Sequence, residues 1–87
     1  MKMIEDIDYV KRSKNRTNIM KSLADNPKIP SELADATLIS RQHISHGLKE
    51  LAQRDMVICL NPKDKRGRIY RLTEKGESVL EIVLKNK

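Results

Sequence analysis

The sequence predicts a mainly helical α+β domain in which three helices are followed by a β-hairpin and a last helix. Apolar residues recur at helical spacing over residues 13–24 and 41–54. A short β-branched run then occupies residues 56–60, and a polar turn separates it from a second strand-like run over 68–72. Since typical domains begin near ~50 residues, the 87-residue chain fits a single domain, 1–87.

The first clear helix is expected from residue 13 to about residue 24. Ser13 can accept a hydrogen bond from a first-turn amide. Asn26-Pro27 ends the helix, because the residue before proline is pushed out of the helical region. Ahead of it, residues 1–12 form an N-terminal extension with a weaker helical pattern. Its apolar residues stand three apart: Ile4, Ile7 and Val10.

Two further helices follow, joined by a tight turn. Pro30 suits the first position of a short helix, where its missing N–H costs nothing. Residues 37–39 form the turn, and Ser40 can cap a third helix over residues 41–54. Asp55 then stands just past the helix end, where a left-handed backbone is often needed and Asp tolerates it. Two helices joined in this way form a helix-turn-helix unit, whose second helix can enter the major groove of DNA.

A β-hairpin and a last helix complete the chain. The run MVICL over residues 56–60 predicts a strand. Residues 61–67 form a polar turn, and residues 68–72 return as a second strand. Thr73 can cap the last helix, which takes up residues 73–87.

Basic residues are concentrated in two blocks on a chain whose formal net charge is +6. Residues 9–28 hold six basic groups against one acidic group, and residues 61–71 hold five against one. The rest of the chain is therefore net acidic. Such blocks are typical of a protein that binds a polyanion, whereas charge that only keeps a protein soluble is more evenly mixed.

Several classes of protein and site are not expected. Cys59 is the only cysteine, which excludes an internal disulfide and favours an intracellular, cytoplasmic chain. No apolar run is long enough for a membrane span, and no signal-peptide core opens the sequence. His43 and His46 stand three apart with Cys59 elsewhere, which does not make a metal site. Without a phosphate-binding glycine loop, a carboxylate pair or a nucleophile–base pair, neither a cofactor nor an enzyme activity is expected.

The third helix has a polar face suited to reading DNA. At about 100° per residue, Ile44, Leu48 and Leu51 share one side. The opposite side collects amide, imidazole, hydroxyl and ammonium groups, which can bond base edges or phosphates. We therefore expect base contacts from Arg41, Gln42, Ser45, His46 and Lys49. Gln42 lies in the first turn, and glutamine can pair bidentately with adenine. Gly47, which is costly within a helix, is expected to allow close helix packing.

Residues 13–76 resemble the winged-helix domains of the MarR- and ArsR-like transcriptional regulators, in a compact form similar to small archaeal ones. The likeness is carried by the pieces Glu32-Leu33-Ala34, Leu48-Lys49-Glu50-Leu51, Asp64-Lys65-Arg66 and Leu72-Thr73-Glu74-Lys75-Gly76. The family implies a winged helix-turn-helix, in which a three-helix core carries a two-stranded wing. It also implies a homodimer that binds double-stranded DNA and usually represses transcription. Two glycines usual in the family are replaced here by Leu38 and Asp55.

The resemblance also implies how the wing contacts DNA. It places the basic residues around Gly67 at the wing tip, along the backbone or in the minor groove. It implies that Asp64 pairs with a nearby arginine and holds the tip in shape. Together with the rest of the two basic blocks, the expected backbone contacts are Lys14, Arg16, Ser40, Lys63, Lys65, Arg66, Arg68 and Arg71.

The last helix carries more apolar surface than one core-facing side needs, about 200° of arc. The excess predicts a subunit interface, which the N-terminal extension could complete. The expected interface residues are Ile4, Ile7, Val10, Val79, Leu80, Ile82, Val83 and Leu84. The alternative is that this helix closes the core of its own chain. No effector pocket can be argued from the sequence.

These observations favour a sequence-specific DNA-binding transcription regulator. One alternative is a winged-helix protein–protein adaptor, which would want apolar or acidic residues on the open face of the third helix. Another is a non-specific binder of nucleic acid or chromatin. Affinity that depends on salt alone would indicate the non-specific binder, and a large ratio of specific to non-specific affinity would indicate a regulator.

Overall fold

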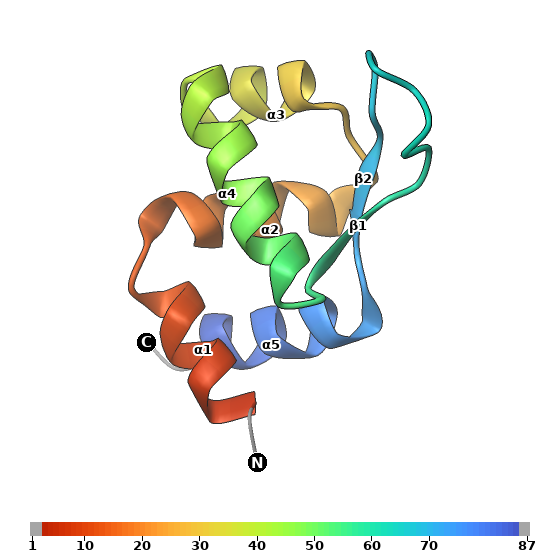
Figure 1. The fold of residues 1–87 in the computed structure, drawn as a ribbon. Helices are drawn as coiled ribbons and strands as arrows, with labels where there is room; N and C mark the ends of the chain where they lie inside the picture. Colours follow the sequence, from red (N-terminus) through yellow and green to blue (C-terminus); the bar gives the residue numbers. More distant parts are fainter. Residues whose placement is uncertain (1–2, 86–87) are drawn as a thin grey trace.

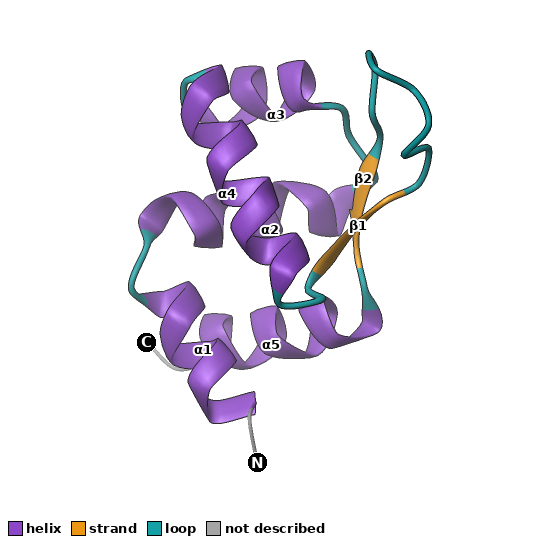
Figure 2. Cartoon of the chain, in the orientation of Figure 1, coloured by secondary structure: helices purple, strands orange, loops and turns teal. Residues whose placement is uncertain are grey.

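The structure is a computed structural model that describes residues 3–85. Within that range the chain forms five helices and a two-stranded antiparallel sheet (Figures 1 and 2). In chain order these are α1 (Met3–Lys11), α2 (Lys14–Asp25), α3 (Pro30–Thr37), α4 (Arg41–Gln53), β1 (Val57–Cys59), β2 (Tyr70–Leu72) and α5 (Glu74–Lys85). The predicted class, mainly helical α+β with a winged helix-turn-helix order, is confirmed. Residues 1–2 and 86–87, at the ends of the expected extension and last helix, lie outside the described residues.

Helices α2, α3 and α4 pack into a three-helix core. The predicted caps are present: Ser13 accepts a hydrogen bond from the Arg16 amide at 3.2 Å, and Ser40 accepts one from the His43 amide at 3.3 Å. Gly47 lets α4 approach α2, because a Cβ at this position would lie 2.7 Å from Cδ1 of Ile19. The core residues of these helices are all buried: Ile19, Met20, Leu23, Leu33, Ile44, Leu48 and Leu51.

Two residues leave their helices through a left-handed backbone. Leu38 joins α3 to α4 with φ 62° and ψ 22°, and its side chain is 92% exposed. Asp55 follows α4 with φ 60°, as the sequence predicts. These are the two positions at which the family that the sequence resembles usually has glycine. The chain therefore keeps the left-handed turn geometry with a leucine and an aspartate in place of the two glycines.

The hairpin is shorter than the sequence predicts. Its register pairs Val57 with Leu72, Ile58 with Arg71 and Cys59 with Tyr70, so the strands cover 57–59 and 70–72 rather than 56–60 and 68–72. Beyond Cys59 the Leu60 amide still donates to the Ile69 carbonyl at 2.7 Å, and the side chain of Asn61 accepts a hydrogen bond from the Ile69 amide at 2.7 Å. On its other side β2 meets the α2–α3 connection. There the Lys28 amide donates to the Tyr70 carbonyl at 3.0 Å, and the Tyr70 amide donates to the Lys28 carbonyl at 2.9 Å.

Helices α1 and α5 form a second layer beneath this core and pack against each other (Figure 1). Thr73 caps α5, accepting a hydrogen bond from the Gly76 amide at 3.0 Å. A side chain at Gly76 would collide with the Met56 carbonyl, so this glycine lets α5 begin against the end of α4. Four of the eight residues expected at a subunit interface are buried in this layer: Val10, Val79, Leu80 and Val83. Burial of these four residues within one chain favours the alternative, in which the last helix closes the core of its own chain.

Candidate nucleic-acid interface

The polar face of α4 is exposed, as its helical spacing predicts. Its members share solvent exposure and hydrogen-bonding or charged groups: Arg41, Gln42, Ser45, His46, Lys49 and Gln53. Ile44, Gly47 and Leu48 on the opposite side are buried, which fixes the polar face outward. The structure thus brings the five expected base-contacting residues together on one accessible surface.

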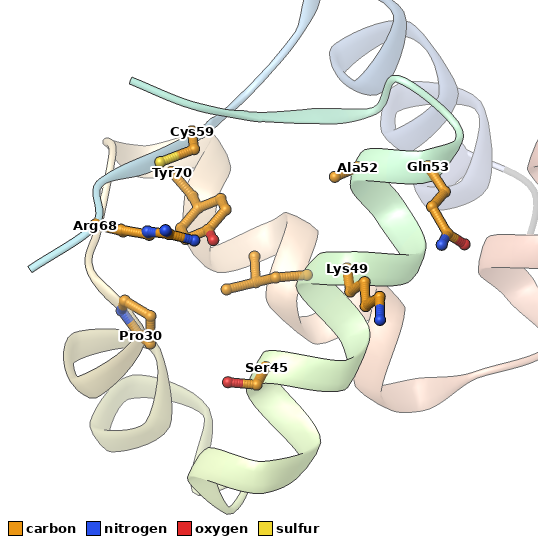
Figure 3. A pocket seen from close by; sticks show the side chains of 9 residues that line it. Pro30, Ser45, Lys49, Ala52, Gln53, Cys59, Arg68 and Tyr70 are labelled. Atoms are coloured by element: carbon orange, nitrogen blue, oxygen red, sulfur yellow. The ribbon is translucent and has the colours of Figure 1, made fainter. Parts of the chain in front are cut away.

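A groove runs between α4 and the wing. One hollow of about 510 Å³ has Arg68 and Tyr70 from the wing side and Ser45 and Lys49 from α4 (Figure 3). A second hollow of about 590 Å³ shares Ser45, Arg68 and Tyr70 and continues toward the wing tip. Its basic lining residues are Arg41, Lys65, Arg66 and Arg68. The two hollows therefore form one groove that extends from the first turn of α4 to the basic residues of the wing.

All five expected wing cations are exposed: Lys63, Lys65, Arg66, Arg68 and Arg71. Gly67 turns the chain with φ +65°, a conformation that L side chains rarely adopt, so the tip depends on a glycine there. Concentrated positive charge beside an exposed polar helix attracts a polyanion, which side chains of both the helix and the wing can then contact.

Asn61 organises the wing, and sequence reasoning missed it. Its amide nitrogen donates to the Asp64 carboxylate at 2.8 Å and to the Gly67 carbonyl at 3.1 Å. Its amide oxygen accepts from the Ile69 amide at 2.7 Å. The available signal was its place directly after a strand, where Asn commonly bonds nearby backbone to form a turn.

The carboxylate of Asp64 bonds Asn61 rather than an arginine, which corrects the pairing that the resemblance implies. Arg68 does reach Asp64, but its Nε donates to the backbone carbonyl at 2.7 Å. Asp64 therefore braces the tip through an amide and through its own main chain. Arg66 carries none of these bonds, so its guanidinium extends from an already fixed turn.

Arg16 is the one expected backbone contact that the structure withdraws from the surface. Its side chain is only 18% exposed and pairs with Glu50 of α4, with Nε 3.3 Å from Oε1. Its Nη1 donates to the Tyr9 carbonyl at 2.8 Å. Arg16 is therefore engaged within the chain, by the Tyr9 carbonyl of α1 and the Glu50 carboxylate of α4, which disfavours the expected DNA contact. Lys14, two residues earlier, is exposed at the first residue of α2.

Glu50, which pairs with Arg16, also contacts a residue on the polar face of α4. Its Oε2 lies 3.3 Å from Nε2 of His46, which is 72% exposed. The pKa of the Glu50 carboxyl is lowered: the hydrogen bond from Arg16 is the largest cause, burial opposes it, and the charges of Arg16 and His46 add to the lowering. Glu50 therefore stays ionised near neutral pH. His46, one of the residues expected to contact bases, thus has the Glu50 carboxylate as a neighbour.

A buried carboxylate joins the two layers of the molecule. Asp6 of α1 is 4% exposed, and its oxygens lie 3.1 Å from Nη1 of Arg54 and 3.0 Å from Nζ of Lys75. Burial raises the pKa of the Asp6 carboxyl, but the hydrogen bonds and charges of Lys75 and Arg54 outweigh it and the pKa is lowered. Lys75 also donates to the Arg54 carbonyl at 2.8 Å. These contacts hold α1, the end of α4 and α5 together, so the cluster is structural.

The rest of the expected interface residues are at least partly accessible. Ile4 is 74% exposed and Leu84 is 41% exposed, while Ile7 and Ile82 are half-buried. Among residues 3–85 no three histidine, cysteine, aspartate or glutamate side chains are grouped so that they could hold a metal ion. None of the helices within this range is both long and apolar enough to span a membrane.

Comparison with known proteins identifies the fold and a family. The sequence pattern of the family described as "HVO_A0261 N-terminal domain" matches residues 4–85. No curated protein matches the chain.

Among solved structures, the chain is similar to a MarR family transcription regulator, with 25% identity, a TM-score of 0.76, and coverage of 85% of this chain and 50% of that one. It is also similar to the transcriptional regulator BldR from Sulfolobus solfataricus, with 27% identity, a TM-score of 0.73, and coverage of 85% and 56%. A third similar structure is the transcriptional repressor CouR bound to a 23-mer DNA duplex, with 28% identity, a TM-score of 0.70, and coverage of 79% and 50%. The chain thus has the winged-helix fold of MarR-type regulators and spans about half the length of these proteins.

Proposed function

The chain belongs to the HVO_A0261 N-terminal domain family, and we propose that it is a sequence-specific transcription regulator that binds double-stranded DNA. The observation that carries the proposal is the groove in which the first turns of α4 and the cations of the wing tip meet. A helix in the major groove and a basic hairpin on the flanking backbone need this juxtaposition. The similarity to CouR, whose structure contains duplex DNA, supports it.

In this proposal α4 reads sequence and the wing positions the protein. Gln42 and Arg41 lie in the first turn of α4 and contact base edges, where Gln favours adenine and Arg favours guanine. Ser45, His46 and Lys49 continue along the groove or reach its backbone. The wing cations, with Ser40 and Lys14, bind phosphates and carry little sequence information.

We also propose that the chain acts as a repressor and as a homodimer. Repression follows the similarity to CouR, which is described as a repressor. The apolar residues left accessible for a subunit contact are Ile4 and Leu84, flanked by Ile7 and Ile82. Two copies would then read half-sites one helical turn apart, about 34 Å.

Selection of bound duplexes from a random library, with competitor DNA, tests the function. We expect a motif with two half-sites spaced by about one turn of DNA, or about 34 Å. A library without enrichment would contradict the proposal and favour a non-specific binder or a protein adaptor. An enriched single half-site would contradict the dimer alone.

Gln42→Ala tests the reading role of α4 on the selected duplex. Loss of a bidentate base contact should weaken cognate binding by about tenfold while leaving random DNA nearly unchanged. Gln53→Ala is the matched control, because it removes the same amide from the last turn of the same exposed face. Fluorescence anisotropy with both duplexes measures the two ratios. Equal losses on cognate and random DNA would remove Gln42 from base reading.

A further inference from the structure

Tyr9 of α1 is enclosed by two guanidinium groups from the core. The Cζ atom of Arg16 lies 3.6 Å from the centre of the Tyr9 ring, and that of Arg54 lies 3.8 Å from it. Arg16 belongs to α2, and Arg54 follows the last residue of α4. A guanidinium stacked on an aromatic face is attracted by the ring quadrupole and held in one orientation by its planar shape. One side chain from outside the three-helix core therefore orders two arginines of that core.

Each of these arginines is bound in turn to a carboxylate. Arg16 presents a fork to Glu50, with Nη2 3.3 Å from Oε2 and Nε 3.3 Å from Oε1. Arg54 donates from Nη1 to Asp6 at 3.1 Å. Each arginine is therefore held by a ring contact and an ion pair together, although Arg54 remains 39% exposed while Arg16 is 18% exposed.

The contacts reach α4 at two places one turn apart. Glu50 is held in the last turn of the helix, and Arg54 is held at its C-cap. Residues four apart lie on the same side of a helix. The contacts from α1 and α2 therefore hold one side of α4 and oppose rotation of α4 about its own axis. Glu50 also carries the contact to His46, on the face proposed to read DNA.

We propose that Tyr9 is a positioning residue for DNA recognition, which acts through Arg16 and Glu50 to set the rotation of α4. Helix α1 thereby belongs to the DNA-binding apparatus without touching DNA. The inference rests on the proposed function, because the effect that it assigns to Tyr9 is on the affinity for duplex DNA. Its structural part concerns the free protein.

Tyr9→Leu in the full chain tests the proposal. It removes both ring contacts, and we expect about tenfold weaker binding to the selected duplex, within the range of coupling energies carried by packed networks. Tyr9→Phe keeps the ring and both guanidinium contacts and loses only the hydroxyl, which also hydrogen-bonds Glu50, so it should lose less affinity than Tyr9→Leu. Val10→Ala is the matched control, because it destabilises the same helix through a buried cavity and leaves both guanidinium contacts in place. Affinity is compared at equal folded fraction.

A double-mutant cycle separates positioning from general destabilisation. Glu50→Gln alone and Tyr9→Leu alone should each weaken binding, and the double variant should lose much less than the product of the two, because both changes break one path. Multiplicative losses, or a loss in Val10→Ala equal to that in Tyr9→Leu, would overturn the proposal. If Tyr9→Leu does not fold, Arg16→Lys serves in its place, since lysine keeps the charge and loses the fork.

Amide chemical shifts of the free protein test the structural part without DNA. Tyr9→Leu should shift amides along the exposed side of α4 more than Tyr9→Phe, which removes only the hydroxyl. Unchanged α4 amides in Tyr9→Leu would overturn the proposal even if the chain binds DNA. Shifted amides in a wild-type chain that selects no duplex would instead contradict the proposed function and leave the rotation of α4 by Tyr9 in place.

Discussion

Leu38 connects α3 to α4 with a left-handed backbone and an exposed apolar side chain, both of which are unfavourable. Its φ of 62° lies in the left-handed region, which costs an L residue about 1–2 kcal/mol. Its side chain is 92% exposed, so burial returns almost nothing for the strain. The turn is held instead by its backbone, since the Leu38 amide donates to the Ala34 carbonyl at 2.9 Å.

Leu38→Gly should stabilise the free protein. Glycine adopts this conformation without a Cβ penalty, so the free energy of unfolding should rise by about 0.5–1 kcal/mol after the entropy of the unfolded glycine is deducted. Asp55→Gly is the comparison at φ 60°, and it should gain less because Asp tolerates this region better than Leu. Urea unfolding of both variants measures the difference. A stability loss in Leu38→Gly would mean that the leucine side chain itself stabilises the turn.

At the scale of elements, the wing is a short sheet extended by one side chain. Paired strands cover only three residues each, and Asn61 then bonds the residues on both sides of the tip. The cations at the tip are held on a formed turn, so little chain entropy is lost when phosphates bind.

Arg66→Ala tests the wing as a phosphate-binding element. Loss of one phosphate contact should weaken binding to all duplexes and reduce the slope of log K against log salt by about one unit. Arg12→Ala is the control of equal charge, because Arg12 pairs with Asp8 of α1, and α1 lies at the opposite end of the molecule from the wing tip (Figure 1). Anisotropy titrations from low to high salt give both slopes. If both variants give the same slope, the Arg66 contact is refuted.

At the scale of the whole molecule, the Asp6 cluster makes the two layers depend on ionised carboxylates. The pKa values of Asp6 and Glu50 are lowered in the folded chain. A lowered folded pKa means that the stabilisation is present above the ordinary carboxyl pKa, near pH 4 to 4.5, and is lost as pH falls through the folded value. Acid should therefore loosen α1 from the core.

Asp6→Asn should lower the free energy of unfolding at pH 7 by about 2 kcal/mol, the worth of a charged hydrogen bond. It should also flatten the fall in stability between about pH 5 and pH 3. Glu50 keeps its own contribution, so part of the acid dependence stays. Denaturant unfolding at several pH values measures the change, and parallel acid profiles for wild type and variant would contradict the ionised Asp6 cluster.

Local signals in the sequence predict most of this architecture, and distant partners account for two of the errors, whereas the role of Asn61 in the wing was missed although its partners are near in sequence. Ser13, Ser40 and Thr73 cap helices within three residues of their own position, so each could be recognised from its neighbours. Arg16 could not, because its partner Glu50 stands 34 residues away. The excess apolar surface of α5 predicted a subunit interface for the same reason, since α5 packs against α1 and α2, which are distant in the sequence.

The backbone bridge between Lys28 and Tyr70 has a consequence for the kind of DNA this fold can accept. It ties β2 to the connection that enters α3, so the wing root and the helix-turn-helix share main-chain bonds. These bonds restrain the position of the wing root relative to α3 and α4 in the free protein. In the proposed complex, a duplex whose groove width suits this spacing would bind without deformation, whereas a wider or narrower one would have to bend to make both contacts. Sequence preference can therefore extend, through DNA stiffness, to base pairs that no side chain touches.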